Sequence, residues 1–317
     1  MRTAIIGAGA IGSFLGALLY NSGYDVRLIG REAHVNKINE RGLIIQQGSA
    51  KQQGYLKISQ MPIKVPSSVQ SDSIGSVDLA IVATKAYSTH GALSEHESVI
   101  SRDTKVLTLQ NGLGQKEIVE HYLEARFNSS IAQENNYGGI SSYGIAFIEP
   151  GTIRYNGEGK VVVGSYSGED CSDIVAMFQK ADLMAEASED IIGAIWTKLL
   201  VNVGISALAT YHSVCNGELV TREDLKKDLL GLVAEGYKVA MSLGINVPDD
   251  IGTIALEVAE ATANNTNSML QDIQRERKTE IDEINLQIII RADQLGIPIP
   301  LNQKYYNLIK EIEKKHL

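Results

Sequence analysis

Near its amino terminus the chain reads Gly7-Ala8-Gly9-Ala10-Ile11-Gly12. The apolar run before these glycines, Thr3 to Ile6, is typical of a buried parallel strand, and the run after them, Phe14 to Leu19, suits a packed helix. The glycines therefore fall where a strand turns into a helix. At such a turn Gly7 would permit the tight bend, Gly9 would let a pyrophosphate approach the backbone, and Gly12 would let helix and strand pack closely.

The segment after this turn indicates the cofactor. The start of the helix, around Ala8, Ala10 and Ile11, would offer free N–H groups to phosphates. A second strand, expected roughly over Asp25 to Ile29, delivers Arg31 nineteen residues after the last glycine. An Asp or Glu there accepts hydrogen bonds from a ribose 2′-hydroxyl, whereas an Arg pairs with a 2′-phosphate. The pattern predicts NADP(H); the alternative is a lone glycine motif beside an ordinary surface arginine.

Composition narrows the class of protein. At 317 residues, with 44% apolar and 21% charged residues, the chain can form two domains with cores. A net charge of −9 without a basic stripe argues against nucleic-acid binding. Cys171, Cys215 and six scattered histidines show no metal-ligand spacing, so we expect free thiols and no metal. We expect no signal peptide, no apolar run of membrane-spanning length and no membrane partner, and therefore a cytoplasmic protein.

The pattern along the chain changes once. In the first half, expected strands at Val77–Thr84 and Lys105–Gln110 end in polar residues, at the edge where doubly wound sheets bind ligands. Between residues 139 and 164, Gly, Pro and Asn separate short strands, which suggests an antiparallel extension of the sheet. Helical periodicity then runs from about Glu189 onward. We expect an α/β fold: a Rossmann-type doubly wound domain over residues 1–188 and an all-helical domain over 189–317.

Two polar side chains at the strand ends are candidate ligand contacts. Lys85 could supply positive charge near an anionic ligand, and Asn111 could hydrogen-bond a nicotinamide ribose or a substrate. Asn-Gly is also a common turn and lysine is commonly solvated. Ordinary loop chemistry is therefore the alternative at each position.

A sharper signal lies on one apolar helix. Lys198, Asn202 and Ser206 are four residues apart and line one flank of that helix. Because the other positions are apolar on most sides, this row favours a cleft over bulk water. Lys198 could then protonate a ketone oxygen as hydride reaches the carbon. Partial burial would lower its pKa, and a nearby carboxylate would raise it.

A second polar cluster follows later in the helical half. Ser268 with Gln271, and Thr279 with Asp282, each resemble the start of a helix that the hydroxyl caps. Helix starts also direct donors at anions, so Ser268 could contact a ligand as well. Glu280 would lie in a first turn, where it could meet a lysine across a cleft. The capping role and the ligand role are compatible.

Together these segments resemble the ketopantoate reductase (2-dehydropantoate 2-reductase) family over nearly the whole chain. The motifs that carry the resemblance are GAGAIG at 7–12, TKAY at 84–87, LQNG at 109–112, WTKLLVN at 196–202, and SMLQD with TEID at 268–272 and 279–282. The resemblance implies NADPH-dependent reduction of 2-dehydropantoate to pantoate, a step toward coenzyme A. It implies that Lys198 is the proton donor and that Glu280 is the acid at the cofactor and this lysine. It places Asn111 near both cofactor and substrate, and Asn202, Asn216 and Ser268 at substrate-contacting positions.

The chain departs from the family pattern at two positions. Ser206 stands where the family commonly has an asparagine followed by proline, and it is shorter and lacks an amide. Tyr143 stands in place of a histidine. Because altered hydrogen bonds to a substrate hydroxyl can shift selectivity, the exact 2-oxoacid stays open.

Three alternatives to this reading of the function stay open. The first is a paralogous NADPH reductase of another branched 2-oxoacid. The second is a non-catalytic nucleotide sensor, which would bind nicotinamide without turnover. The third is a decarboxylating β-hydroxyacid dehydrogenase, whose glycine-rich serine segment is not visible in this sequence. The amphipathic helical domain could also pack on a second copy of the chain as a homodimer.

Overall fold

The computed structural model describes residues 1–48 and 61–316. Its contacts divide the chain into two compact units. The first, the sheet unit, contains residues 1–110 and 115–191, and the second, the helical unit, contains residues 111–114 and 192–317. The short loop 111–114 therefore belongs to the helical unit, although the residues before it, up to Gln110, belong to the sheet unit.

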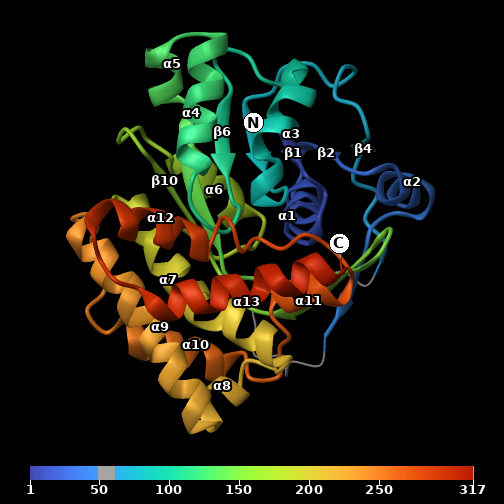
Figure 1. The fold of residues 1–317 in the computed structure, drawn as a ribbon. Helices are drawn as coiled ribbons and strands as arrows, with labels where there is room; N and C mark the ends of the chain where they lie inside the picture. Colours follow the sequence, from blue (N-terminus) through green and yellow to red (C-terminus); the bar gives the residue numbers. More distant parts are fainter. Residues whose placement is uncertain (49–60, 317) are drawn as a thin grey trace. The chain divides into compact units, whose positions relative to one another are not determined.

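The sheet unit is built on a mostly parallel sheet with the order β11-β10-β7-β6-β5-β1-β2-β4. Figure 1 labels β10, β6, β1, β2 and β4 of this sheet. Its strands are β1 (Arg2–Ile6), β2 (Asp25–Ile29), β4 (Ser67–Ser68), β5 (Leu79–Val82), β6 (Lys105–Thr108), β7 (Asn136–Ser141), β10 (Val161–Ser165) and β11 (Ala185–Ala187). Because β1 pairs in parallel with both β2 and β5, the strand order reverses beside β1. Doubly wound sheets bind ligands at the carboxyl ends of such strands. The predicted fold class is confirmed.

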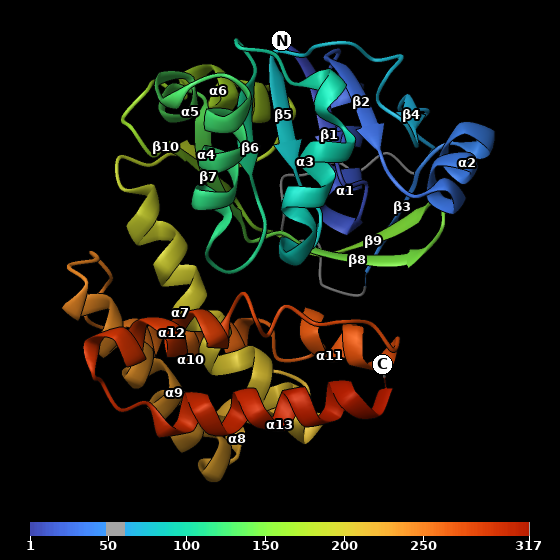
Figure 2. The same cartoon turned by 45° about the horizontal axis from the view of Figure 1, so that its top comes forward.

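The predicted antiparallel extension is only partly correct. Strand β10 joins the main sheet antiparallel to β7. In contrast, β8 (Gly144–Glu149) and β9 (Thr152–Gly157) form a hairpin that pairs with β3 (Ile44–Gln47) in a separate sheet (Figure 2). The hairpin leaves the main sheet because its aromatic residues pack against helices: Tyr155 stacks on Phe14, with ring centroids 5.7 Å apart.

Helices cover both faces of the main sheet. They are α1 (Ala10–Asn21), α2 (Glu32–Arg41), α3 (Thr89–Glu95), α4 (Gln115–Arg126), α5 (Ser129–Glu134) and α6 (Ser172–Lys180), with short 3₁₀ turns η1 (Ala86–Ser88) and η2 (Glu97–Val99). Neighbouring residues of β1 point to opposite faces, so Ile5 packs in one core and Ile6 in the other. Burial on both faces explains why the strands read as short apolar runs in the sequence.

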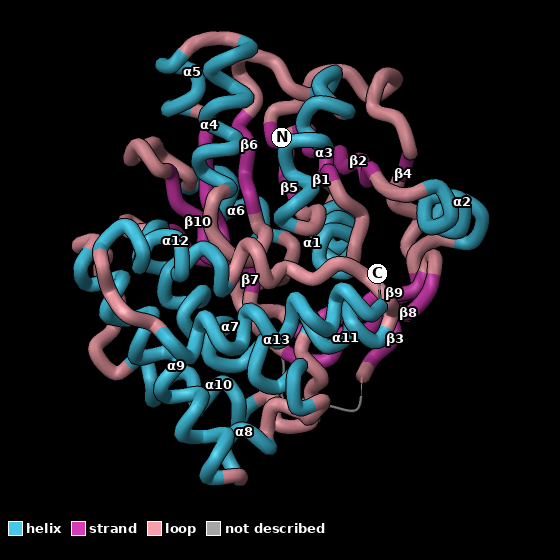
Figure 3. The backbone as a smooth tube through the Cα atoms, in the orientation of Figure 1, coloured by secondary structure: helices cyan, strands magenta, loops and turns pink. Residues whose placement is uncertain are grey.

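The helical unit surrounds one long apolar helix. Its helices are α7 (Ile191–His212), α8 (Glu218–Thr221), α9 (Glu223–Ser242), α10 (Ile251–Ala261), α11 (Ser268–Gln274), α12 (Asn285–Leu295) and α13 (Pro300–His316), coloured cyan in Figure 3. Helices α7 and α9 lie very close, since a Cβ on Gly204 would come within 2.7 Å of the Val233 side chain. The row of Lys198 and its neighbours is therefore carried by a tightly packed core helix.

The expectation that no apolar run reaches membrane-spanning length is wrong. By length and composition alone, helix α7 is long and apolar enough to cross a membrane. Its single lysine and single asparagine lower its mean hydropathy less than its many aliphatic residues raise it. Of its most apolar window, 67% is buried inside the protein. The core helix of a folded domain meets the same criterion.

Candidate active site

The three glycines of the first turn differ in the space around them. Gly7 has φ +105°, and a Cβ there would lie 2.6 Å from the backbone nitrogen of Thr84. A Cβ on Gly12 would collide with the carbonyl oxygen of Gly7. At Gly9 the nearest atom, the carbonyl oxygen of Ala83, would be 4.0 Å away. Gly7 and Gly12 are thus enclosed by the fold, while the backbone at Gly9 is open to a ligand.

The backbone N–H groups at this turn are only partly available. Those of Gly7 and Ala8 both donate to the carbonyl oxygen of Ile29, at 3.0 and 2.8 Å. Helix α1 begins at Ala10, so its geometry leaves the N–H groups of residues 10–12 without an intrahelical acceptor. These groups and the open backbone at Gly9 fit a pyrophosphate. The N–H of Ala8, which we predicted among the cofactor contacts, is already used within the fold.

Arg31 lies directly after β2 and beside the glycine turn. The preceding Gly30 is so close to that turn that a Cβ on it would come within 2.7 Å of the Ala8 side chain. Arg31 itself is exposed and forms the N-cap of α2. Within residues 1–48 and 61–316, its guanidinium makes no hydrogen bond or ion pair. This side chain is therefore available to an anion at the place where the ribose of a dinucleotide is expected.

Side chains join the carboxyl ends of β5 and β6. The amide nitrogen of Gln110 donates to Thr84 at 3.3 Å and to Thr89 at 2.8 Å. Sequence reasoning missed the part played by Thr89, because it lies in α3, beyond the motif. Lys85, our predicted anion contact, is half-buried at the N-cap of η1. The polar residues that follow β5 and β6 are thus linked by hydrogen bonds at this edge of the sheet unit.

In the helical unit, the Asn-Gly loop packs against the turn that carries Glu280. Asn111 Nδ2 donates to Glu280 Oε2 at 3.3 Å. The next residue, Gly112, has φ +89° and lies against the carbonyl group of Glu283, which also accepts the Leu113 N–H at 3.0 Å. Asn111 is therefore half-buried and hydrogen-bonded to Glu280, which favours a role in a binding site over that of an ordinary solvated loop.

Lys198, on α7, interacts electrostatically with Glu280 and so belongs to the same group of residues. Burial lowers the pKa of its ammonium group from the ordinary 10.5 to about 8, and the carboxylate of Glu280 acts in the opposite direction. Glu280 is buried, with 5% of its surface exposed, whereas Lys198 retains partial exposure. An ammonium group with this pKa is charged at neutral pH and can still release its proton to a substrate.

The rest of the polar row leads to the start of α11. Asn202 is half-buried and Ser206 is buried. The carbonyl oxygen of Ser206 accepts a hydrogen bond from Asn267 Nδ2 at 3.4 Å. Asn267 also caps α11, because its side-chain oxygen accepts the Leu270 N–H at 2.9 Å.

Two predictions about helix starts are therefore corrected. Ser268 is the first residue of α11 and is exposed, and the extended backbone at Asn267 makes Asn267 the capping residue. The Ser268 hydroxyl does not cap the helix. Thr279 does not start a helix either: its hydroxyl accepts the Ile281 N–H at 3.2 Å in a turn, and α12 begins only at Asn285.

Asn216 and Tyr143 have different surroundings. Asn216 is buried and its amide nitrogen donates to Thr262 at 2.9 Å, while its side-chain oxygen has no hydrogen-bond partner in the described part of the chain. That oxygen is an acceptor that a substrate hydroxyl could satisfy. Tyr143 belongs to the core of the sheet unit, where its hydroxyl accepts the Met184 N–H at 2.8 Å and its ring lies 5.3 Å from that of Phe14. This departure from the family pattern thus has a packing role.

Comparison with known families decides the relationship. The family described as "Ketopantoate reductase PanE/ApbA" matches residues 3–168, and "Ketopantoate reductase PanE/ApbA C terminal" matches residues 190–313. The chain belongs to the ketopantoate reductase family. It is 37% identical to the 2-dehydropantoate 2-reductase of Pyrococcus horikoshii over 99% of this chain and 98% of that protein. With the 2-dehydropantoate 2-reductase of Archaeoglobus fulgidus it shares 30% identity, over 98% of each chain.

Solved structures of similar fold include two kinds of enzyme. A PanE/ApbA family ketopantoate reductase from Ralstonia eutropha JMP134 superposes with a TM-score of 0.86 at 28% identity, covering 100% of this chain and 99% of that one. D-mandelate dehydrogenase, solved with NADH and anilino(oxo)acetate, has a TM-score of 0.87 at 29% identity, with the same coverage. This member of the ketopantoate reductase family is an oxidoreductase that acts on a small molecule with a pyridine nucleotide. Among residues 1–48 and 61–316, no group of three or more His, Cys, Asp or Glu could hold a metal ion.

Proposed function

We propose that this enzyme reduces 2-dehydropantoate to pantoate with NADPH. The observation that carries the proposal is the arrangement of Asn111, Lys198 and Glu280 in one unit, with the lysine pKa lowered to about 8. The relatives named 2-dehydropantoate 2-reductase match along the full chain, which supports the same substrate.

The chain's own residues supply the proton and the orientation in this reaction. When bound, the nicotinamide supplies a hydride to the ketone carbon. Lys198 donates its proton to the ketone oxygen, so that a hydroxyl group forms and the lysine is left neutral. Glu280 orients Lys198 and favours its charged form before the step. Asn111 fixes the Glu280 carboxylate through its amide.

Substrate is held by polar groups of the helical unit. We assign Asn202, Ser206 and Ser268 to the hydroxyl and carboxylate groups of the 2-oxoacid, and the unpartnered oxygen of Asn216 to a substrate hydroxyl. Arg31, available on the sheet unit, is assigned to the 2′-phosphate of NADPH, and Lys85 to an anionic group of the ligand. The product would then enter pantothenate and coenzyme A biosynthesis in the cytoplasm.

A second candidate is the reduction of a different 2-oxoacid, and two observations favour it. Ser206 replaces the amide that the family motif commonly has, and it is buried on the polar row. A structural neighbour at 29% identity is a D-mandelate dehydrogenase solved with NADH, so this fold accepts other 2-hydroxy acids and the other nucleotide. Both the substrate and the nucleotide therefore need a direct comparison.

Steady-state kinetics of the full chain tests the proposal. NADPH and NADH would each be combined with 2-dehydropantoate, 2-oxoisovalerate and benzoylformate. We expect the largest kcat/KM for NADPH with 2-dehydropantoate. A larger value for another 2-oxoacid would replace the substrate, and a preference for NADH would replace the cofactor. Binding of nucleotide without turnover of any 2-oxoacid would contradict the enzyme and favour the sensor.

A further inference from the structure

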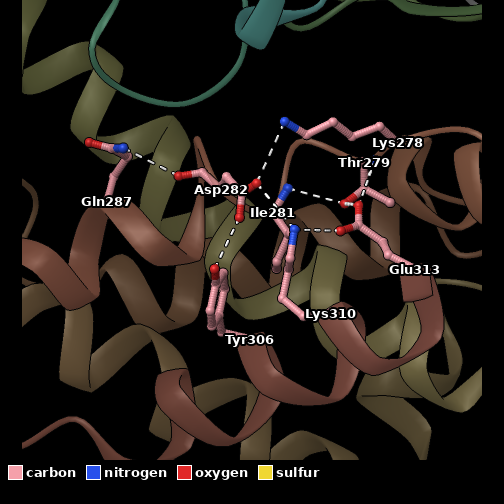
Figure 4. A network of polar contacts seen from close by, with 8 residues as sticks. All are labelled: Lys278, Thr279, Ile281, Asp282, Gln287, Tyr306, Lys310 and Glu313. Atoms are coloured by element: carbon pink, nitrogen blue, oxygen red, sulfur yellow. Dashed lines mark hydrogen bonds and ion pairs between the residues drawn. The ribbon is translucent and has the colours of Figure 1, made fainter. Parts of the chain in front are cut away.

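The turn that carries Glu280 is tied to the last helix of the chain. Residues Thr279–Ile284 precede α12 and lie outside any regular helix. Helix α13 presents Tyr306, Lys310 and Glu313 to this turn, at the three- and four-residue spacing of one helix face (Figure 4). The conformation next to Glu280 therefore depends on side-chain contacts with α13.

Glu313 makes the central contact. It is buried, with 4% of its surface exposed. Its Oε1 atom accepts both the backbone N–H of Thr279, at 2.8 Å, and the Thr279 hydroxyl, at 2.7 Å. The same hydroxyl oxygen accepts the N–H of Ile281 at 3.2 Å. The residues on both sides of Glu280 are thus linked to one carboxylate, and hydrogen bonds to a charged acceptor are strong ones.

A second set of contacts holds the same turn from Asp282. Lys310 Nζ lies 2.7 Å from Glu313 Oε2 and 3.2 Å from Asp282 Oδ2. Tyr306 donates its hydroxyl proton to Asp282 Oδ1 at 3.1 Å. Lys278 Nζ lies 3.7 Å from Asp282 Oδ2 (Figure 4). These cations offset the charge of the two carboxylates, which allows Glu313 to remain a buried hydrogen-bond acceptor.

We propose that Glu313 is a positioning residue for the reductase reaction: through Thr279 it fixes the turn from which Glu280 faces Asn111 and Lys198. The inference rests on the proposed roles of Lys198 and Glu280. Small displacements of a positioned group reduce turnover strongly. Loss of the Glu313 contact should therefore reduce kcat, although Glu313 itself bonds Thr279 and Lys310.

The chain offers a matched control at the other end of α13. Glu235 of α9 is also buried and accepts the N–H groups of Leu301 and Asn302, both at 2.9 Å. Like Glu313 it is a buried carboxylate that binds backbone N–H groups and secures α13. Its contacts are with the first turn of that helix and not with the turn of Glu280. Glu235→Gln should therefore reproduce the loss of stability without the loss of positioning.

The experiment compares Glu313→Gln with Glu235→Gln in the full chain. The measurements are Tm, kcat, KM for the 2-oxoacid that the wild type reduces best, and the pH at which kcat declines. We expect Glu313→Gln to lower kcat about tenfold to a hundredfold with a small change in KM. The decline in kcat should also move to lower pH, because a displaced Glu280 raises the Lys198 pKa less. Glu235→Gln should lower Tm and leave kcat and the pH of this decline unchanged.

Thr279 provides a second pair of variants. Thr279→Ser keeps the hydroxyl that bonds Glu313 and should retain most of kcat. Thr279→Val is nearly the same size as threonine but removes that hydroxyl, so it should lower kcat in the same direction as Glu313→Gln. If Glu313→Gln does not fold, the comparison of Thr279→Ser with Thr279→Val tests the proposal for Glu313 instead.

Two outcomes would overturn the proposal for Glu313. One is a wild-type kcat and pH profile in Glu313→Gln, or in Thr279→Val if the first variant is unfolded. The other is an equal loss of kcat in Glu235→Gln at an equal loss of Tm. Failure of the proposed function is a separate result: the wild type would reduce no 2-oxoacid, or Lys198→Ala would remain fully active.

Discussion

Glu280 accepts a hydrogen bond from Asn111 at 3.3 Å, although the two residues are 169 positions apart in the sequence. The contact joins the loop after β6 to the turn before α12, and both segments belong to the helical unit. Lys198, whose pKa responds to Glu280, lies in the same unit. The proposed proton donor and the two residues that orient it are thus assembled within one compact part of the chain.

The pH dependence of turnover tests the role of Lys198. Because the proton donor must be charged and burial lowers its pKa to about 8, kcat should stay level below that pH and decline above it. Glu280→Gln removes the charge that raises this pKa, so the decline should begin at lower pH. Measurement of kcat from pH 6 to pH 10, at saturating substrate, checks both statements. An unchanged profile in Glu280→Gln would contradict the pairing.

Replacement of Arg31 tests the preference for NADPH. A hydrogen bond to a charged group contributes about 1.5–3 kcal/mol, so Arg31→Ala should weaken NADPH binding roughly tenfold to a hundredfold. NADH binding should hardly change, since NADH lacks the 2′-phosphate. Arg102, exposed elsewhere on the sheet unit, gives a control substitution, Arg102→Ala. Equal losses for the two nucleotides, measured by fluorescence titration, would argue against the phosphate contact.

Ser206 is expected to shape the choice of substrate. Ser206→Ala removes only the hydroxyl and should lower kcat/KM for the preferred 2-oxoacid up to about tenfold. Ser206→Asn restores the group common in the family and should shift the preference toward 2-dehydropantoate. Ser242→Ala, at the exposed end of α9, serves as the control. If Ser206→Ala left kcat/KM unchanged across the panel of 2-oxoacids, Ser206 would have no part in binding them.

His34 should make the stability of the sheet unit pH-dependent. Its Nδ1 atom accepts the Gly151 N–H at 2.9 Å and its Nε2 atom lies 2.9 Å from the Ser13 hydroxyl oxygen. Burial lowers the pKa of this imidazole from 6.5 to about 4. Between these values the unfolded chain takes up a proton that the folded chain does not. Stability is therefore lost as pH falls from 6.5 toward 4, by up to about 3 kcal/mol in total.

Urea unfolding at pH 7 and pH 5 measures this effect. His34→Asn should be less stable than the wild type at pH 7, because the Gly151 N–H and the Ser13 hydroxyl lose their partner. Its further loss between pH 7 and pH 5 should be smaller than that of the wild type. The exposed His90 provides the control variant His90→Asn. Equal pH dependence in His34→Asn and the wild type would show that His34 is not the group responsible.

The local parts of the fold were accessible from the sequence. The expected second strand, Asp25 to Ile29, is the strand observed, because apolar residues that alternate with charged ones before a glycine are typical of a strand. The identity of the three glycines likewise predicted a turn, and the positive φ of Gly7 and the close contacts of Gly7 and Gly12 agree with it. Features of the fold that depend on contacts between residues distant in the sequence could not be predicted from it. The β8–β9 hairpin gave no sign of which sheet it would join.

The same limit applies to the candidate site. The polar row on α7 follows from helical spacing, but the contact between Asn111 and Glu280 is set by tertiary packing. Glu313 carries no motif and lies 34 residues after Thr279, so only the structure links them. Ser268 and Asn267 are both good capping residues, and the backbone conformation at Asn267 decides between them.

The most direct test of the central claim is single-turnover oxidation of NADPH by 2-dehydropantoate in the wild type and in Lys198→Ala. Lys238→Ala, at a more exposed lysine of α9, controls for the loss of a positive charge in the helical unit. If Lys198 is the proton donor, Lys198→Ala should bind NADPH normally and react about a hundredfold to ten-thousandfold more slowly. A rate in Lys198→Ala close to that of the wild type would contradict the account.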